Sequence, residues 1–286
     1  GRVSSLLGYC YYMKGDYISA ARIYEELSYY YPDNEEYRFY IAQFYFKSGD
    51  YDAALRICNN IKNPELIEKL TTLLGYIKYE TGDLSQALGI AQIQEYKCPS
   101  FIILQGSIYL KQEKIEEALL LFEKARAIYG STSEIIYNIA LSHYKNKEYD
   151  KCMHYIAEII ERGTREYPDL YMGTRSDSPS YIKNSLSLKE SALIEAFNLK
   201  VAIEYNLKNQ INAKEALHDM PQRKEEDLDP VTLMNQALIY FDNNPTEGFK
   251  KMNFLLENPP FPDETFCNIL LQYAKYEYYD LAADVL

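Results

Sequence analysis

Leu7-Gly8-Tyr9-Cys10-Tyr11-Tyr12, followed by Gly15-Asp16-Tyr17, is the stretch that decides the fold. A second copy of the same pattern reads Leu74-Gly75-Tyr76-Ile77-Lys78-Tyr79 and continues with Gly82-Asp83-Leu84. Between the two copies stands Gly49-Asp50-Tyr51, 34 residues after Gly15 and 33 residues before Gly82. An internal period of this length, with small residues at fixed offsets, indicates a stack of helical hairpins.

The period can be followed along the chain because the first unit starts near residue 1, so its residue numbers equal the repeat positions. Position 8 is mostly small and reads Gly8, Ala42, Gly75, Gly106, Ala140, Ala202, Ala237 and Leu270. Position 20 is mostly small as well and reads Ala20, Ala54, Ala87, Ala118, Cys152, Lys214, Phe249 and Ala282. Position 11 is large and reads Tyr11, Tyr45, Lys78, Tyr109, His143, Tyr205, Tyr240 and Tyr273. The pattern gives eight units, of which the sixth and seventh fit least well.

Each repeated position has a packing reason. Small residues at positions 8 and 20 let two antiparallel helices approach closely, and the large residue at position 11 fills the space between them. Gly15 and its equivalents allow the left-handed turn that ends the first helix, and the following Asp caps the second helix. The sequence therefore predicts an all-α fold, a tetratricopeptide-repeat α-solenoid in which antiparallel helix pairs form a right-handed superhelix.

One interruption divides the array. Ala140 and Ala202 are 62 residues apart instead of 34, so about 28 extra residues lie between the fifth and sixth units. We expect repeats 1 to 5 over residues 1–164, an irregular insert over 165–194 with a helix from roughly residue 181, and repeats 6 to 8 over 195–286. The eighth unit is expected to be truncated in its second helix, as in a piece of a longer array. A charged stretch over 220–230 reads as a solvated connector between units six and seven.

Composition narrows the ligand classes. The chain has 286 residues with 30 Lys+Arg against 42 Asp+Glu, and its formal net charge is −12. Phosphate binding needs a basic surface, so nucleic acid is not expected as a partner. No apolar run reaches the roughly 18 residues of a membrane span, so no membrane insertion is expected either. Tyrosine is unusually frequent, with 30 residues, whereas tryptophan is absent.

The usual chemical motifs are missing. The five cysteines are scattered without a C-x-x-C pair, and the histidines His143, His154 and His218 form no metal-ligand pattern. No phosphate-binding glycine loop and no nucleophile elbow occurs. We therefore predict no catalytic residues, no cofactor and no metal site.

In tetratricopeptide proteins the first helix of each unit lines the concave face through positions 2, 5, 6, 9, 12 and 13, and the resemblance to them implies the same here. Positions 5, 9 and 12 are largely aromatic or aliphatic, and the aromatic candidates for partner binding are Tyr9, Tyr12, Phe39, Phe46, Tyr76, Tyr79, Tyr137, Tyr144 and Phe241. Position 6 adds the amides of Asn138, Asn235 and Asn268, which can pair with a peptide backbone.

Such a lining suits an extended apolar or proline-rich strand, because aromatic faces pack on a preformed polyproline helix at low entropy cost. The alternative is that these side chains only fill a tightly wound superhelix. The basic residues at inner positions 2 and 6 (Arg2, Lys69 and Lys200) are far apart in the array. A clamp for a C-terminal carboxylate is therefore not expected.

The later half of the chain carries a more specific likeness. Its distinctive strings are HYIAEIIERG (154–163), EAFNLK (195–200), Asp219-Met220-Pro221, LDPVTL (228–233), Asn235-Gln236-Ala237-Leu238, Thr246-Glu247-Gly248-Phe249 and YEYYDLAADVL (276–286). In this order they resemble the tetratricopeptide repeat protein 30 family, the tetratricopeptide subunit of the intraflagellar transport B complex.

The resemblance implies a non-catalytic ciliary scaffold that wraps a proline-rich segment of intraflagellar transport protein 52 and contacts other B-complex subunits. It also implies a role in anterograde transport and cilium assembly, a link to tubulin polyglutamylation, and a location in the cilium and basal body on the cytoplasmic side. Two alternatives stay open: a generic peptide-binding adaptor outside cilia, and an enzyme hidden in the helical array.

Overall fold

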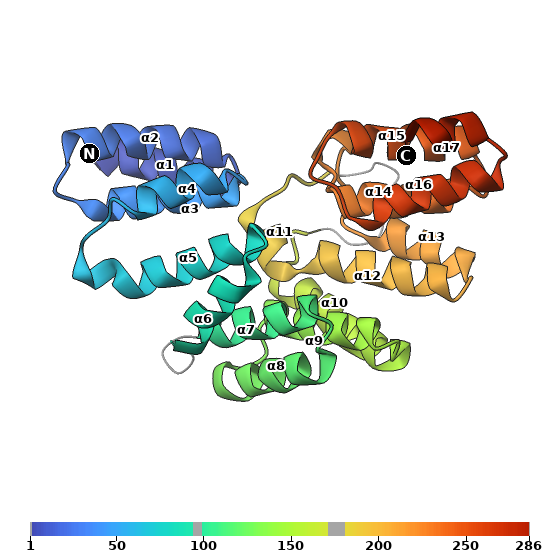
Figure 1. Cartoon of the computed structure of the whole chain (residues 1–286), viewed down its shortest axis with the longest axis horizontal. Coiled ribbons are helices and arrows are strands. Elements are labelled where there is room, and N and C mark those ends of the chain that lie inside the picture. The colour runs from blue at the N-terminus through green and yellow to red at the C-terminus, as the bar shows by residue number, and fades with distance from the viewer. Residues whose placement is uncertain (1, 94–98, 171–180, 286) are drawn as a thin grey trace. The chain divides into compact units, whose positions relative to one another are not determined.

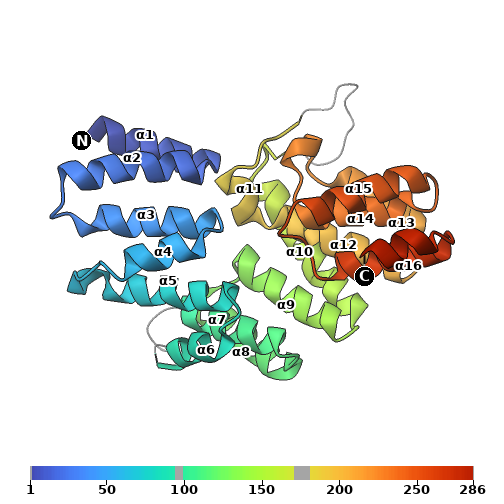
Figure 2. The same cartoon turned by 45° about the horizontal axis from the view of Figure 1, so that its top comes forward.

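The computed structural model describes residues 2–93, 99–170 and 181–285, and this part of the chain contains helices and no strand. Eight consecutive helix pairs follow the predicted units (Figures 1 and 2). The pairs are α1 (Arg2–Lys14) with α2 (Tyr17–Tyr30), α3 (Glu35–Lys47) with α4 (Tyr51–Cys58), α5 (Ile67–Glu80) with α6 (Leu84–Ile93), α7 (Pro99–Lys111) with α8 (Ile115–Tyr129), α9 (Ser133–Lys145) with α10 (Tyr149–Glu166), α12 (Leu193–Asn206) with α13 (Gln210–Asp219), α14 (Pro230–Tyr240) with α15 (Pro245–Glu257), and α16 (Glu264–Lys275) with α17 (Tyr279–Val285). Outside the pairs lie η1 (Pro64–Leu66), α11 (Leu186–Ser191) and η2 (Glu225–Asp227).

The chain forms two compact units, described separately below. Unit 1 contains Gly1–Tyr155 together with Asn184–Glu190, and unit 2 contains Ile156–Lys183 together with Ser191–Leu286. Unit 1 is therefore discontinuous, because a short segment of the predicted insert belongs to it. The predicted domain division at residues 164 and 194 stays a prediction.

Close approach within the pairs explains the small residues at position 8. A Cβ on Gly8 would lie 2.5 Å from a ring carbon of Tyr24, and a Cβ on Gly106 would lie 2.6 Å from one of Phe122. Because atoms cannot approach so closely, a larger residue would force the aromatic ring or the helix to move. The aromatic residue of the second helix thus packs directly on the backbone of the first.

In seven of the eight pairs the turn contains a left-handed residue, whether or not that residue is glycine. Gly15, Gly49 and Gly82 have φ values of 83°, 86° and 83°. The equivalent residues of later units are Glu113, Lys147, Lys208 and Glu277, with φ between 59° and 62°. The predicted caps are also present, since Asp16 and Asp50 accept backbone N–H groups of Ser19 and Ala53 at 3.1 and 2.9 Å. Later repeats therefore keep the left-handed turn although they lack the glycine.

The predicted register of the sixth unit is wrong by one residue. In six of the turns, the N–H at position 16 donates to the carbonyl at position 11; Asp16 bonds to Tyr11 in this way. The corresponding bond of the sixth unit joins Asn209 to Glu204, which places Glu204 at position 11 in place of Tyr205. Position 20 is then the fully buried Ala213 and not the exposed Lys214.

The seventh unit differs for another reason, because its turn is one residue shorter. Asn244 donates to the carbonyl of Tyr240, four residues back instead of five. The second helix is shifted accordingly, so position 20 is Gly248, whose Cβ would lie 2.8 Å from the Phe241 ring, and not Phe249. With both corrections, position 20 is small in all eight units.

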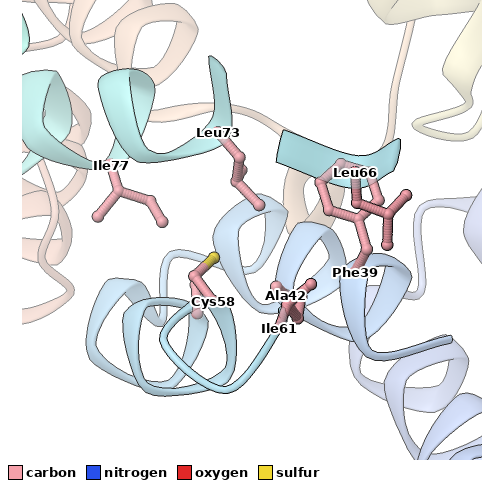
Figure 3. Packing of buried hydrophobic residues seen from close by; sticks show 8 residues of the cluster. Phe39, Ala42, Cys58, Ile61, Leu66, Leu73 and Ile77 are labelled. Carbon is pink, nitrogen blue, oxygen red and sulfur yellow. The ribbon is translucent and has the colours of Figure 1, made fainter. Parts of the chain in front are cut away.

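Cores form between successive pairs as well as within them. One cluster joins Phe39 and Ala42 of α3, Cys58 of α4, Leu66 of η1 and Leu73 of α5 (Figure 3). These side chains are at most 6 % exposed. The second and third repeats are thereby held together by continuous apolar packing.

The predicted insert is only partly helical. α10 ends at Glu166, residues 171–180 lie outside the described residues, and α11 begins at Leu186, five residues after the expected start. Ala192, with φ 54°, separates α11 from α12. The interpretation of the charged stretch 220–230 as a solvated connector is wrong for one of its charges, Arg223, and the uncharged Met220 and Pro221 are buried as well. Arg223 is 7 % exposed, whereas Lys224 and the acidic residues of η2 are exposed or half-buried.

Candidate partner-binding surface

In unit 1, candidate aromatic residues make ring contacts at two places along the first helices, one at repeats 1 and 2 and one at repeats 2 and 3. The ring centroids of Tyr9 and Tyr12 lie 6.3 Å apart, and Tyr12 lies 5.5 Å from Phe44 of the next pair. Phe46 lies 6.5 Å from Tyr76 of the third pair. Aromatic rings at such separations attract one another and fix each other's orientation. Phe46 at position 12 thus meets Tyr76 at position 9 of the next repeat, whereas Tyr12 meets Phe44, a buried core residue at position 10.

The exposure of these rings decides what they can contact. Tyr9 is 51 % exposed, whereas Tyr12, Phe46 and Tyr76 are half-buried. A cavity of about 690 Å³ opens beside Tyr9. Its walls are Arg2, Ser5, Leu6, Tyr9, Tyr24, Tyr31 and Tyr37. Four of the seven lining residues are tyrosines, and Arg2 is the one cation among them.

Tyr79 in the third repeat is half-buried under a cation. The Lys111 ammonium lies 4.3 Å from the centroid of the Tyr79 ring and 3.4 Å from its carbonyl oxygen. Burial, and to a smaller extent the charge of Glu80, raises the pKa of Tyr79. The ring is therefore a neutral phenol that already holds one ammonium group.

The fifth repeat contributes Tyr137, Asn138 and Tyr144, all half-buried. The Tyr144 ring lies 5.9 Å from that of Tyr149, and the Asn138 carbonyl accepts a 2.7 Å hydrogen bond from Ser142 Oγ. These residues belong to unit 1, like the aromatic candidates of the first three repeats.

Two candidates are core residues in this structure. Phe39 is 3 % exposed and packs in the cluster of Figure 3. Phe241 is 1 % exposed and packs against Gly248 and Phe249 because of the short turn of the seventh repeat. Neither ring offers surface to a partner, and the prediction that they contact one stays untested.

The asparagines of unit 2 bond within the protein. Asn235 is 4 % exposed, and its Nδ2 donates to both the backbone oxygen and Oδ1 of Asn198 at 3.1 and 3.0 Å. Asn268 is half-buried, with its Nδ2 3.8 Å from Sδ of Met234. The donor group of Asn235 is thus engaged by its own chain, so this residue is poorly placed to clamp a peptide.

Asn235 is one end of a buried polar network that the sequence did not reveal. Asn198 Nδ2 donates to Thr232 Oγ1 at 2.9 Å, and Thr232 Oγ1 donates to Asp229 Oδ2 at 2.6 Å. Arg223 Nη2 donates to Asp229 Oδ2 at 2.8 Å. Several of the strings that carry the family likeness meet here, because 195–200, 228–233 and 235–238 each contribute a member.

Two further observations concern metal binding and membrane insertion. Within the described ranges, no group of three or more His, Cys, Asp or Glu side chains is arranged to hold a metal ion. His143 is buried, with Nδ1 2.7 Å from Glu148 Oε2 and its ring stacked on Tyr155. None of the helices in the same ranges has the length and apolar character needed to cross a bilayer.

Comparison with known proteins extends these observations. A family model described as a tetratricopeptide repeat matches residues 11–65. A tetratricopeptide repeat protein from Parabacteroides merdae has a similar structure, with a TM-score of 0.58, 11 % identity, and coverage of 92 % of this chain and 95 % of that one. At this identity the likeness shows the fold alone, and it confirms the predicted all-α tetratricopeptide architecture.

The sequence relatives are more specific. Intraflagellar transport protein 70A of Xenopus laevis is 46 % identical over 284 residues, which are 99 % of this chain and 44 % of the relative. Intraflagellar transport protein 70A2 of Mus musculus is 44 % identical over 294 residues, with the same two coverages. The chain therefore spans less than half the length of these relatives. The predicted likeness to the tetratricopeptide repeat protein 30 family, which is the same family under another name, is confirmed. The chain belongs to the intraflagellar transport protein 70 family of tetratricopeptide-repeat proteins.

Proposed function

We propose that the chain is a non-catalytic scaffold of the intraflagellar transport B complex. It holds an extended, proline-rich segment of a partner subunit, intraflagellar transport protein 52, and works in the cilium and at the basal body, on the cytoplasmic side. Support for anterograde transport, cilium assembly and the delivery of tubulin-polyglutamylating enzymes follows from that assembly role. The names of the relatives support membership in an intraflagellar transport complex, and the tetratricopeptide architecture is typical of proteins that bind other proteins.

The observation that carries the proposal is a pair of aromatic contacts on the first helices of repeats 1 to 3, Tyr9 with Tyr12 and Phe46 with Tyr76. A polyproline helix presents a flat apolar surface every third residue and loses little entropy on binding. Partly exposed tyrosine rings on successive helices are suited to contact such a surface. The resulting surface is defined here as Tyr9, Tyr12, Phe46, Tyr76, Tyr79, Tyr137 and Tyr144, with Asn138 as a candidate backbone contact.

A pull-down with a proline-rich fragment of the partner tests the proposal. The triple replacement of Tyr76, Tyr79 and Tyr144 by Ala is expected to abolish capture. The matched control replaces Tyr29 and Tyr30, which are 82 % and 72 % exposed on the second helix of the first repeat, and is expected to bind like the wild type. Because Tyr76 and Tyr79 are half-buried, circular dichroism must show that the triple variant is folded.

The more exposed Tyr9 provides a milder variant. Replacing Tyr9 by Ala removes a ring from the edge of the 690 Å³ cavity with little loss of core packing. We expect weaker capture of the proline-rich fragment with an unchanged melting temperature. Equal capture by wild type, Tyr9→Ala and the folded triple variant would contradict the proposal. Equal capture of a proline-free extended peptide would favour a generic adaptor.

A further inference from the structure

A segment of the insert returns to the first repeat inside unit 1. The Nζ atom of Lys189 donates a 2.8 Å hydrogen bond to the hydroxyl of Tyr17, and it lies 4.7 Å from the centroid of that ring. The two residues are 172 positions apart in the chain. No local sequence pattern would bring them together, so the contact is a specific tertiary interaction.

The backbone also meets the first repeat at its turn. A Cβ added to Gly15 would lie 3.3 Å from the carbonyl oxygen of Asn184, closer than most side-chain contacts. Because Gly15 has φ 83° and no side chain, the carbonyl can approach the turn. The segment Asn184–Glu190 thus contacts both the turn of the first hairpin and the first residue of α2.

The segment has little structure of its own to hold it there. α11 has six residues, and its first turn is supported by Ser185, whose Oγ accepts the N–H of Leu188 at 3.2 Å. A helix of this length is unstable without tertiary contacts. Leu188 is 2 % exposed, so one apolar side chain of the segment is buried while Lys189 reaches Tyr17.

The residues under the segment adjoin the proposed partner-binding surface. The Tyr12 ring lies 5.9 Å from that of Tyr17 and 6.3 Å from that of Tyr9. Burial raises the pKa of Tyr12, and the charges of Tyr17, Glu190 and Tyr9 add to the effect. Tyr12 thus packs against Tyr17, the residue that Lys189 of the segment holds.

We propose that residues 184–190 form an internal strap, a ligand of the first repeat that docks on Gly15 and Tyr17, beside Tyr12, and thereby withholds Tyr12 from a partner. The first repeat would recognise a short helical turn in which a buried leucine precedes a lysine. One ammonium–phenol bond at the surface and one short turn make a contact that is weak enough to be displaced. The docking itself does not depend on the proposed function, whereas its effect on the partner rests on it.

Hydrogen exchange of the whole chain tests the docking. Lys189→Met keeps the length of the side chain but removes the ammonium, so amides of 184–190 should exchange about tenfold faster. Lys183→Met is the matched control, because Lys183 is exposed and directly precedes the segment without belonging to it. Equal exchange of 184–190 in the wild type and both variants would overturn the strap.

A labelled peptide of residues 181–192 tests whether the site accepts a ligand in trans. It should bind the Lys189→Met chain about tenfold more tightly than the wild type, whose own strap competes. Tyr17→Phe in the same chain removes the accepting hydroxyl and should weaken binding again. A peptide that binds neither chain, or that binds all three equally, overturns the strap as a displaceable ligand.

The effect on a partner is measured with the proline-rich fragment. Lys189→Met should bind the fragment more tightly than Lys183→Met. If the strap peptide docks but no variant binds the fragment, the proposed function fails and the strap remains. If all chains bind the fragment equally while exchange of 184–190 differs, the withholding of Tyr12 is overturned.

Discussion

The Nη2 atom of Arg223 lies 2.8 Å from Oδ2 of Asp229 at the junction between the sixth and seventh repeats. The Arg223 side chain is 3 % exposed, so the carboxylate compensates a charge that has almost no contact with water. Asp229 also caps α14, because its Oδ1 accepts the N–H of Thr232 at 2.9 Å. One side chain thus both starts a helix and neutralises a buried cation.

Removing that carboxylate should be costly. Asp229→Ala leaves Arg223 buried without its ionic partner, and we expect the free energy of unfolding to fall by about 3–5 kcal/mol. Urea denaturation followed by circular dichroism measures the loss. The control is Glu226→Ala, which removes an exposed partner of Lys224 at 3.7 Å and should change stability by less than about 1 kcal/mol. Similar losses in both variants would show that the buried ion pair contributes no more to stability than the exposed one.

The same carboxylate predicts a pH dependence. Burial raises the pKa of Asp229, but hydrogen bonds from Thr232 and Arg223 outweigh it and hold the pKa below its usual value. The stability that Asp229 contributes is therefore fully present above the unfolded pKa of about 3.9 and is lost as the pH falls through the folded value. The difference in unfolding free energy between wild type and Asp229→Asn should be constant from neutral pH to about pH 5 and shrink below pH 4. A difference that stays unchanged in acid would contradict this assignment.

Two glycines of unit 1 should respond in opposite ways to alanine. Gly106→Ala places a Cβ 2.6 Å from Phe122 and should lower the free energy of unfolding by about 1–3 kcal/mol. Gly89→Ala on α6 has no atom within 4 Å and should raise it by about 0.4–1 kcal/mol, because alanine favours the helix. Thermal denaturation of both variants compares them. If Gly106→Ala were neutral, the ring would have to move freely, contrary to its full burial.

The left-handed turns should distinguish glycine from other residues. Gly49→Ala introduces a side chain at φ 86° and should destabilise the chain by about 1 kcal/mol, although nothing stands within 4 Å of the new Cβ. Lys147→Gly removes the same strain at φ 59° and should leave stability unchanged or raise it by up to about 1 kcal/mol. Chemical denaturation provides the measurement. Destabilisation by both replacements would mean that Lys147 contributes more through its side chain than its backbone costs.

The cysteines should divide by burial. Burial raises the pKa of Cys58 to about 11 and that of Cys152 to about 12, so neither forms a thiolate at pH 8. Cys10 and Cys267 are exposed and should react readily with iodoacetamide. Mass spectrometry of the alkylated peptides should find Cys58 and Cys152 modified only in denaturant. Their rapid modification in the native protein would contradict the packing of the second and fifth repeats.

The sequence predicted those parts of the fold that depend on short-range signals. The Gly-Asp turn and the small residues at positions 8 and 20 identified the hairpins, since each follows from packing within one unit. The predicted repeat positions of the sixth unit were wrong by one residue because the insert before it interrupts the period. The turn at Lys208 has no glycine from which the positions could be counted again. In the seventh unit, Phe249 was wrongly predicted to occupy position 20 because the turn of that unit is shorter by one residue.

The candidate surface was harder to predict for a physical reason. A repeat position specifies a side of a helix but not how deeply the side chain lies, so Phe39 and Phe241 looked like Tyr76 in the sequence while only Tyr76 keeps partial exposure. The burial of Arg223 could not be predicted either, because a run of charged residues does not show which of them is buried. The contact between Lys189 and Tyr17 joins distant parts of the chain, and no periodicity encodes it.

The discontinuity of unit 1 has a consequence for biosynthesis. The first hairpin ends at Tyr30, and Asn184–Glu190 follows it by about 150 residues. At about 5–20 residues per second, the first hairpin is exposed for seconds before its own strap has been made. A partner segment present during synthesis could reach Tyr12 in that interval without competition. The order of translation would then favour assembly on the nascent chain over assembly on the finished protein.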